Sequence, residues 1–335
     1  MEMINSSPFT IQPLILLDNN GKETLLVVAK ATYAISNGKA QLCEEQEPIN
    51  FADEYWGEPG TSSIKYSGET ALYKPATDVI LLGSAYSTGK NKRSVDVHLS
   101  AGKISKTVRI FGDRRWEGTS LFERISDPMP FDKLPLIYER SFGGNDLSNE
   151  ESPENEHRNP VGVGFRAKHS KRNLSGTPLP NLENPAQLIR SSMDRPEPAG
   201  TSFIAPHWEP RLSLTGTYDS KWKNERAPFL PDDYNPLFQQ TAPVDQIYPG
   251  YMEGGEPISV ENASPNGRLS LLLPATRLDI SVSIGDDTFP LQMRMDTVVI
   301  DGDSCRLRMI WRGSMSVHNN IYDISWIKAA ALEDK

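Results

Sequence analysis

Alternating apolar and polar residues, the pattern of a half-buried β-strand, occur at several places along the chain. In the clearest case, Ser94–Ser100, three apolar residues alternate with three polar ones: Val95, Val97 and Leu99 with Asp96, His98 and Ser100. Successive side chains of a strand point to opposite faces of its sheet. The pattern therefore predicts a strand with one buried and one solvent-facing side, and it places His98 on the solvent-facing side.

The first 140 residues contain further segments that predict strands. Thr24–Ile35 is rich in apolar and β-branched residues and is followed by Asn37-Gly38. This dipeptide favours a tight hairpin, because both central positions of a type I′ turn need a positive φ. Lys39–Cys43 is then the expected return strand. The other strands expected here are Asp78–Tyr86 and Lys103–Phe111, the latter joined to Ser94–Ser100 by a turn at Ala101-Gly102.

The last part of the chain again predicts strands joined by tight turns. Asp301-Gly302-Asp303 lies between two apolar runs and favours a hairpin, and Gly285-Asp286-Asp287 separates two more strands. The strands expected here are Arg268–Leu273, Arg277–Ile284, Thr288–Met295, Thr297–Ile300 and Cys305–Trp311.

Residues 141–255 differ from both flanks and hold 14 of the 26 prolines of the chain. Only Asn184–Met193 has apolar residues at helical spacing, so the rest of this region is expected to form long loops. The acidic segment Asp146–Glu156 is expected to be a mobile, solvated insertion. The many large aromatic residues of the region are expected to anchor its loops, because they would not remain solvated.

Together these patterns predict a mainly β fold with sandwich-like or barrel-like antiparallel sheets, a long proline-rich loop region and little helix. The predicted regions are an N-terminal β region (1–140), an aromatic and proline-rich loop region (141–255) and a C-terminal β region (256–335). The patterns leave open whether these regions form one continuous domain or two lobes.

Charge and composition narrow the classes of partner. The chain has 44 acidic and 35 basic residues, a formal net charge of −9. Positive surface dominates nucleic-acid affinity, so no nucleic-acid partner is expected. Lys168–Arg172 is the main basic cluster and is interpreted as a solvated loop. No apolar run approaches the roughly 20 residues that a bilayer requires, and the N-terminus does not resemble a signal peptide, so a cytoplasmic protein without a membrane partner is expected.

The sequence contains no motif that specifically indicates a catalytic, cofactor-binding or metal-binding site. Gly162-Val163-Gly164 lacks the third glycine of a dinucleotide loop, and the five histidines show no metal-ligand spacing. The two cysteines, Cys43 and Cys305, are expected to be reduced, buried and unreactive. No enzymatic activity, cofactor or metal is therefore expected, although the many carboxylates of so acidic a chain leave a hydrolase open as an alternative.

A series of short motifs is more specific than composition. In chain order the motifs are Lys74–Val79, Gly83–Tyr86, Phe111–Arg114 followed by Trp116, Tyr138–Asp146, Asn159–Phe165, Leu179–Glu183, Pro198–Gly200, Trp208–Arg211, Gly216–Asp219 with Trp222, and Pro228–Tyr234. The series resembles the bacterial family called domain of unknown function 2169, over approximately Lys30–Leu273. Members of that family are typically encoded beside VgrG spikes, PAAR tips and toxins of type VI secretion systems.

The resemblance implies an adaptor or chaperone that binds an effector and assists its loading onto the VgrG or PAAR spike. It carries over no catalytic residues. The expected partners are the N-terminal region of an effector toxin and a spike protein. One alternative is a cell-wall-directed hydrolase with paired carboxylates in a loop-lined cleft. A structural component of the secretion particle is the third hypothesis.

Seven aromatic and arginine residues are candidates for partner binding, because Tyr, Trp and Arg supply much of the binding energy at protein interfaces. They are Tyr138, Arg140, Phe142, Trp208, Arg211, Tyr218 and Trp222. The alternative interpretation is that the motif residues only hold the long loops in shape.

Overall fold

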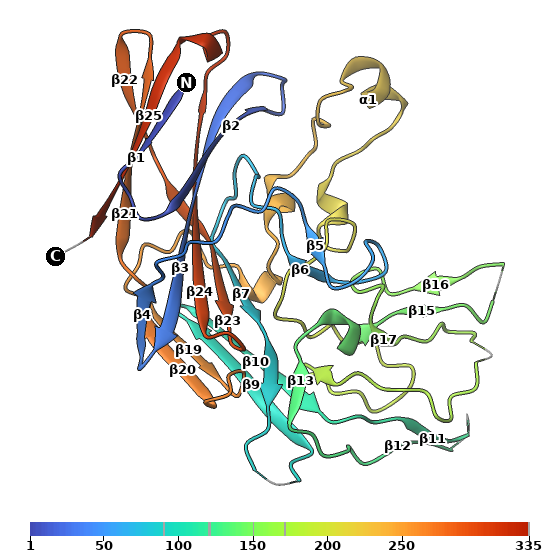
Figure 1. Cartoon of the computed structure of the whole chain (residues 1–335). Helices are drawn as coiled ribbons and strands as arrows, with labels where there is room; N and C mark the ends of the chain where they lie inside the picture. Colours follow the sequence, from blue (N-terminus) through green and yellow to red (C-terminus); the bar gives the residue numbers. More distant parts are fainter. Residues whose placement is uncertain (90, 120–121, 150, 171, 334–335) are drawn as a thin grey trace.

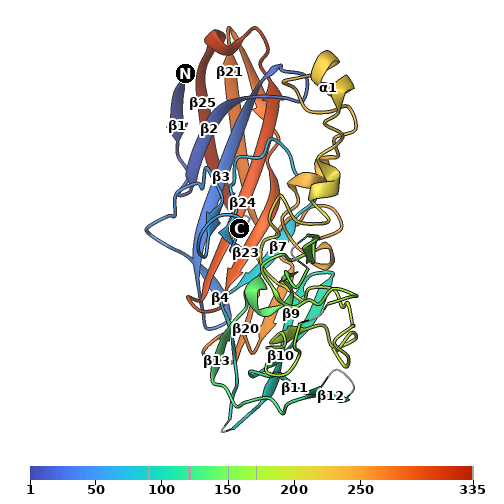
Figure 2. The ribbon, with the colours of Figure 1, turned by 90° about the vertical axis from the view of Figure 1, so that its right-hand side faces the viewer.

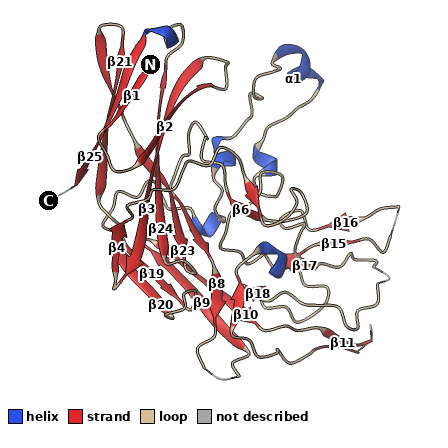
Figure 3. Cartoon of the chain, in the orientation of Figure 1, coloured by secondary structure: helices blue, strands red, loops and turns tan. Residues whose placement is uncertain are grey.

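The computed structural model describes residues 1–89, 91–119, 122–149, 151–170 and 172–333. Strands are far more abundant than helices in these ranges (Figure 3), and the only α-helix there is α1 (Ser220–Glu225). The predicted mainly β fold with little helix is confirmed. None of the helices in the described ranges has the length and apolar character needed to cross a membrane.

A central sheet runs through the middle of the molecule (Figure 1). Its strands lie in the order β2 (Thr10–Leu17), β3 (Glu23–Ser36), β24 (Arg306–Ser316), β23 (Arg294–Asp301) and β7 (Asp78–Leu82), and β4 (Lys39–Leu42) also pairs with β3. Neighbouring strands are antiparallel except for the parallel pair β23 and β7. Strands from both ends of the sequence therefore build one sheet.

Two further sheets contribute to the apolar cores. The second sheet contains β1 (Glu2–Asn5), β25 (Ile324–Glu333), β21 (Thr276–Ile284) and β22 (Asp287–Leu291). The third contains β18 (Leu182–Glu183), β10 (Ile104–Phe111), β9 (Ser94–Ala101), β19 (Pro257–Glu261) and β20 (Arg268–Leu272). In the described part of the chain none of these sheets closes on itself, so the architecture is sandwich-like rather than barrel-like.

The alternating side chains of β3 explain how the layers meet. On one face, Leu25 and Val27 are buried in the core shared with the second sheet, and Ala29 is buried in the core shared with the third. On the opposite face, Leu26 belongs to a cluster with Trp208, which comes from the loops. Because β3 is 14 residues long, this single strand contributes to both sandwich cores and to the floor beneath the loops.

The loops that cover this opposite face contain only short elements; we call residues 138–250 the loop layer. The short strands of this layer are β14 (Phe142–Gly143), β15 (Asn145–Asp146), β16 (Glu154–Asn155) and β17 (Val163–Gly164), and its 3-10 helices are η1 (Tyr138–Arg140), η2 (Leu212–Leu214), η3 (Pro236–Gln239) and η4 (Val244–Gln246). Short elements outside the layer are β5 (Glu54–Tyr55), β6 (Ile64–Tyr66), β8 (Ser84–Tyr86), β11 (Trp116–Thr119), β12 (Phe122–Ile125), β13 (Lys133–Pro135) and η5 (Ile321–Asp323).

Tight turns lie where the sequence predicts them. Asn37 and Gly38 have φ values of 50° and 75° and join β3 to β4. Gly102, with φ 56°, joins β9 to β10, and Gly285, with φ 60°, joins β21 to β22. The hairpin predicted around Asp301-Gly302-Asp303 is formed by β23 and β24.

Two predicted strands are each divided into two. Asp78–Tyr86 breaks at Gly83, which has φ 117° and lies so close to the backbone of Asp303 that a Cβ would be 3.0 Å from its nitrogen. Thr288–Met295 ends as β22 at Leu291, and β23 begins at Arg294.

The helix suggested by Asn184–Met193 is wrong. This segment consists of turns, in which the Asn184 side chain accepts from the backbone N–H of Ala186 and the Asp194 carboxylate accepts from those of Arg190 and Ser191. Such local side-chain hydrogen bonds satisfy backbone donors that a helix would otherwise use.

The prediction that Asp146–Glu156 is a mobile, solvated insertion is wrong for the two ends of this segment. Strands β15 and β16 pair with each other, and the side chains of Asp146 and Glu156 are buried. Glu156 is fixed by Arg158, whose Nε and Nη2 donate to the two carboxylate oxygens at 2.7 Å. Residue 150 lies outside the described residues.

The expected environments of His98 and the cysteines are partly confirmed. Strand β9 alternates as predicted, with His98 half-buried on its more open face and Nδ1 3.0 Å from Thr107 Oγ1. Cys43 and Cys305 are free, but they are half-buried rather than buried.

Candidate functional site

Asp78, which forms a buried ion pair with Lys74, attaches the loop layer to the central sheet through hydrogen bonds. Asp78, at the start of β7, accepts hydrogen bonds from Lys74 Nζ at 2.8 Å, from Gln240 Nε2 at 2.7 Å and from the backbone nitrogen of Thr241 at 2.7 Å. Burial lowers the pKa of Lys74, and the charge of Asp78 opposes this effect. The Lys74 and Asp78 side chains are only 3% and 0% exposed, so this contact is part of the protein interior.

Three of the aromatic candidates for partner binding are buried. Tyr138, Phe142 and Trp208 are 3%, 2% and 0% exposed. The rings of Tyr138 and Trp208 meet edge to face with their centroids 5.4 Å apart. Tyr138 and Trp208 belong to the cluster above β3, whereas Phe142 belongs to a separate cluster with Trp116 and Leu174, so all three support the loops from inside.

The two arginine candidates also contact other parts of the chain. Arg211 is buried and donates to the carbonyl oxygens of Ile204 (2.6 Å) and Phe238 (2.9 Å). Arg140 is half-buried and donates to Asn181 Oδ1 at 2.9 Å. Both guanidinium groups therefore link loops to each other.

Tyr218 and Trp222 are more open, and both belong to a projecting segment. We call residues 215–235 the arm, which carries α1 at its tip and stands away from the sheets in Figure 1. Asp219 caps α1 by accepting from the Trp222 backbone N–H at 2.8 Å, and Trp222 Nε1 donates to the carbonyl oxygen of Phe229 at 2.8 Å. The rings of Tyr218 and Trp222 have centroids 4.7 Å apart, and Tyr218 is 52% exposed.

The arm contacts the turn between β2 and β3, next to which α1 lies in Figure 2. Arg226 Nη2 donates to the carbonyl oxygen of Asn19 at 2.9 Å and to Asn20 Oδ1 at 3.0 Å. Phe229 packs on Gly21, where a Cβ would lie 2.2 Å from the Phe229 ring. Because glycine has no Cβ, position 21 leaves room for the Phe229 ring to pack on the turn.

A groove of about 500 Å³ lies between the arm and the body of the protein. We call it the arm groove. Its body side includes Leu17, Phe51 and Tyr73, which are 59%, 59% and 50% exposed, and its arm side includes Leu230 and Tyr234. Several large apolar side chains that face solvent are thus gathered at one place.

The charged groups that line the arm groove already have partners. Asp53 accepts from the backbone N–H of Gly68 at 2.7 Å and from Ser67 Oγ at 3.2 Å. Lys74 and Arg211, which also line the groove, make the internal contacts described above. The groove therefore offers an occupant large apolar side chains and uncharged polar groups, while its charged lining groups are bonded within the protein.

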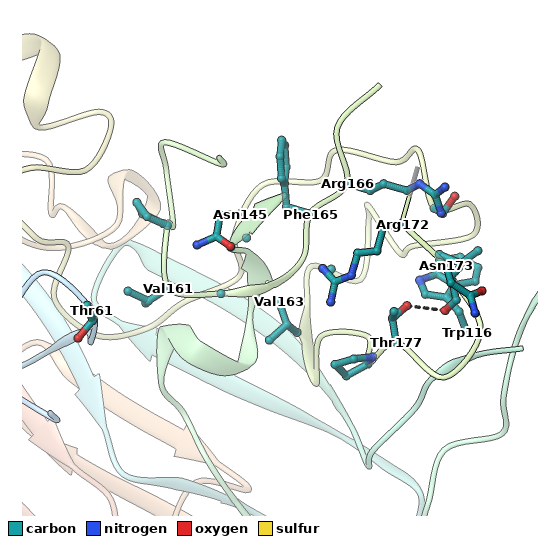
Figure 4. Close-up of a pocket in the computed structure, with 18 of the residues that line it drawn as sticks. Thr61, Trp116, Asn145, Val161, Val163, Phe165, Arg166, Arg172, Asn173 and Thr177 are labelled. Atoms are coloured by element: carbon teal, nitrogen blue, oxygen red, sulfur yellow. Dashed lines mark hydrogen bonds between the residues drawn. The ribbon is translucent and has the colours of Figure 1, made fainter. Parts of the chain in front are cut away.

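A second cavity, of about 470 Å³, lies among the motif loops (Figure 4). We call it the glycine-lined pocket, because Gly143, Gly144, Gly162 and Gly164 form part of its wall. Trp116, Val161, Val163 and Phe165 add apolar surface, and Arg166 and Arg172 add positive charge.

A third cavity, of about 550 Å³, lies between β10 and η4; we call it the Lys106 pocket. Lys106 Nζ lies 2.7 Å from Asp245 Oδ1, and the lysine side chain is 9% exposed. Glu197 and Glu209 also line this cavity, and Glu209 accepts from Ser213 Oγ at 2.8 Å. Among the described residues no group of three or more His, Cys, Asp or Glu side chains is arranged to hold a metal ion.

Sequence reasoning missed most of the residues that line these cavities. Leu17, Phe51 and Tyr73 lie outside the resembling motifs and carry no distinctive local pattern. Arg172 belongs to the basic cluster interpreted from sequence as a solvated loop, and only the folded chain brings this arginine to the glycine-lined pocket.

The fold and these cavities define a class of protein in which a β-sandwich carries a layer of long, internally bonded loops with an exposed apolar groove. The family model described as an uncharacterized protein conserved in bacteria (DUF2169) matches residues 20–312. The chain belongs to this family, and the match extends beyond the range of motifs, Lys30–Leu273, that carries the resemblance. No curated protein and no solved structure matches the chain.

Proposed function

We propose that this protein is an adaptor or chaperone of a type VI secretion system. It binds the N-terminal region of an effector in the cytoplasm and assists its loading onto the VgrG or PAAR spike. Membership of the family supports this function, together with the gene neighbours typical of the family. The observation that carries the proposal is the exposed apolar surface of the arm groove.

The arm groove suits a polypeptide partner for two physical reasons. Exposed apolar patches on soluble proteins commonly mark interaction sites, because covering them removes apolar surface from water. Full burial of one large apolar side chain contributes about 1.5–3 kcal/mol. Leu17, Phe51 and Tyr73 are each at least half exposed, so a partner would bury much of their surface.

The chemistry of the arm groove favours an uncharged, apolar segment of the effector. Its charged lining groups are already bonded within the protein, so a charged occupant would lose water without gaining a partner. Bound in the groove, an apolar effector segment is protected from aggregation. It leaves when the spike binds it more tightly, because competing binding shifts the equilibrium by mass action.

The experiment is co-purification with the effector encoded next to this protein, followed by gel filtration. The double variant Leu17→Asp/Phe51→Asp places two charges in the arm groove, and we expect it to lose the complex while keeping its own elution volume. The matched control is Leu272→Asp/Tyr322→Asp, which alters residues that are 65% and 100% exposed and do not line this groove. Failure of the wild-type protein to bind the effector, or equal binding by both variants, contradicts the proposal.

The carboxylates of the Lys106 pocket motivate the second candidate function, a cell-wall-directed hydrolase. Paired carboxylates are the usual catalytic groups of glycoside hydrolases. Three acidic residues line this cavity. Asp245 pairs with Lys106, whereas Glu197 and Glu209 form no ion pair with any described lysine or arginine. Release of soluble fragments from purified cell walls by the wild type, lost in Glu197→Gln/Glu209→Gln, supports the hydrolase. Stable co-purification with assembled spikes supports a structural component instead.

A further inference from the structure

The glycine-lined pocket is formed where two motif loops pair with each other. Phe142 and Gly143 in β14 lie beside Val163 and Gly164 in β17 as a parallel pair. A Cβ on Gly144 would lie 2.4 Å from the carbonyl oxygen of Gly162. The close packing of the loops accounts for this glycine, but it does not account for the side chains around the cavity.

The charge of this lining is unusual for so acidic a protein. The chain has a formal net charge of −9, yet no aspartate or glutamate is among the described residues that line the glycine-lined pocket. Arg166 and Arg172 both line it, and neither forms an ion pair with any described residue. In Figure 4 the side chain of Arg172 extends toward Val163. An arginine in this setting offers a planar set of donors suited to a carboxylate.

Two acidic side chains of neighbouring segments, Asp146 and Glu123, are hydrogen-bonded to loop residues. Asp146 accepts from the backbone N–H groups of Ser148 and Ala167, each at 3.0 Å. Glu123 accepts from the backbone N–H of Ser192 at 3.0 Å and from its hydroxyl at 2.7 Å. Both carboxylates therefore hold the surrounding loops.

The remaining lining adds apolar surface and further donors. Val161, Val163 and Phe165 can cover the aliphatic part of an acidic residue, and the side-chain amides of Asn145 and Asn173 can donate hydrogen bonds. The cavity volume of about 470 Å³ falls within the range of roughly 300–1,000 Å³ that is typical of ligand sites. The size exceeds what a single small ion needs.

We propose that the glycine-lined pocket binds an acidic segment of a partner polypeptide, with a carboxylate of that segment held by Arg172. Charge complementarity selects this occupant, because the described lining has two arginines without ion pairs to described residues, apolar walls beside them and no aspartate or glutamate. The proposal rests on the proposed function, since it gives the effector a second, acidic contact besides the apolar segment in the arm groove.

The experiment measures binding of a fluorescent peptide by anisotropy, using the full-length protein. The probe is a short peptide in which aspartate and glutamate alternate with glycine and alanine. Its matched control has asparagine and glutamine at the acidic positions, and inorganic phosphate is the competitor. We expect the acidic peptide to bind at least about tenfold more tightly than its amide counterpart, and salt to weaken this binding.

Two arginine variants test whether the acidic peptide binds in the glycine-lined pocket. Arg172→Gln is expected to weaken binding of the acidic peptide about tenfold or more, because it removes charge-assisted hydrogen bonds. The control is Arg277→Gln in β21, an exposed arginine that does not line the pocket, and it should bind like the wild type. Equal binding of the two peptides, or no effect of Arg172→Gln, overturns the proposal. Complete displacement by equimolar phosphate overturns it in favour of an inorganic anion site.

The two proposals can fail separately. If the wild-type protein binds the acidic peptide but no effector, the proposed adaptor function fails and the anionic site remains. If the effector complex forms equally well with Arg172→Gln and with the wild type, the adaptor function remains and the second contact is wrong.

Discussion

Lys30 Nζ lies 2.8 Å from Glu69 Oε1, and the two side chains are only 2% and 10% exposed. Lys30 lies on β3, on the face that supports the loops, whereas Glu69 belongs to the segment that follows β6. The lysine also donates to the carbonyl oxygen of Pro48 at 3.0 Å, and Glu69 accepts from the backbone N–H of Asn50 at 2.9 Å. One buried ion pair thus joins this segment to the central sheet.

Replacing one partner of this pair should destabilise the protein strongly. Lys30→Met leaves the Glu69 carboxylate buried without its cation, and we expect the free energy of unfolding to fall by about 3–5 kcal/mol. The double variant Lys30→Met/Glu69→Leu should lose less stability than Lys30→Met and Glu69→Leu lose in sum, because no unpaired charge remains. Urea denaturation measures the free energy of unfolding of these three variants. Arg268→Met, which breaks the exposed pair with Glu261, is the control and should lose no more than about 1 kcal/mol. A similar loss for Lys30→Met and Arg268→Met contradicts this account.

Gly200 fits against the ring of Tyr138 so closely that a Cβ would lie 2.2 Å from Tyr138 Cζ. Gly200→Ala should therefore lower the free energy of unfolding by about 1–3 kcal/mol through overpacking. The shorter side chain in Tyr138→Leu should relieve the clash. The double variant Gly200→Ala/Tyr138→Leu should therefore lose less stability than the two single variants lose in sum. Gly68→Ala is the control, since its Cβ would meet nothing nearer than 3.5 Å. Strict additivity of the two changes would show that the ring contact has no part in the effect.

The contact between Phe229 and Gly21 should determine how well the arm is held. Gly21→Ala places a Cβ 2.2 Å from the Phe229 ring, so the ring must leave the turn. We expect faster hydrogen exchange in residues 216–235, measured by mass spectrometry, with little change in the sheets. Gly285→Ala is a matched control, because Gly285 also has a positive φ (60°) but a Cβ at this position would have no neighbouring atom within 4 Å. Equal exchange of the arm in the two variants contradicts the prediction.

Asp146 should contribute stability that depends on pH. Burial raises its pKa, but hydrogen bonds from the side chains of Ser170 and Ser148 and from the backbone of Ser148 and Ala167 outweigh this and lower the pKa to about 2. Because the folded-state pKa lies below the unfolded value of about 3.9, this contribution is complete above about pH 4 and is lost as the pH falls toward 2.

The variant Asp146→Asn measures that contribution. It should be less stable than the wild type in urea denaturation at pH 6, and the difference should shrink at pH 3. Asp286→Asn, in the exposed turn between β21 and β22, is the control and should follow the wild type at both pH values. A difference for Asp146→Asn that is the same at pH 6 and pH 3 shows that the carboxylate charge is not responsible.

Local pattern was sufficient for the main strands and their turns. The alternation of Ser94–Ser100 corresponds to β9, and Asn37-Gly38 forms the turn that follows β3. Both signals are local, because side-chain direction in a strand repeats every two residues and a turn conformation depends on its own residues. The helix expected at Asn184–Met193 is absent because Asn184 and Asp194 bond nearby backbone N–H groups, a competition that apolar spacing does not reveal.

The sequence by itself also determined which residue types would be available for binding, but not which of them reach the surface. Trp208 and Tyr218 look equally suitable as aromatic contacts, yet Trp208 is 0% and Tyr218 is 52% exposed. Burial is a property of contacts between segments far apart in the chain, and only the tertiary structure specifies those contacts. For the same reason, only folding could bring Leu17 and Phe51 to one groove, or Arg172 and Val163 to one pocket.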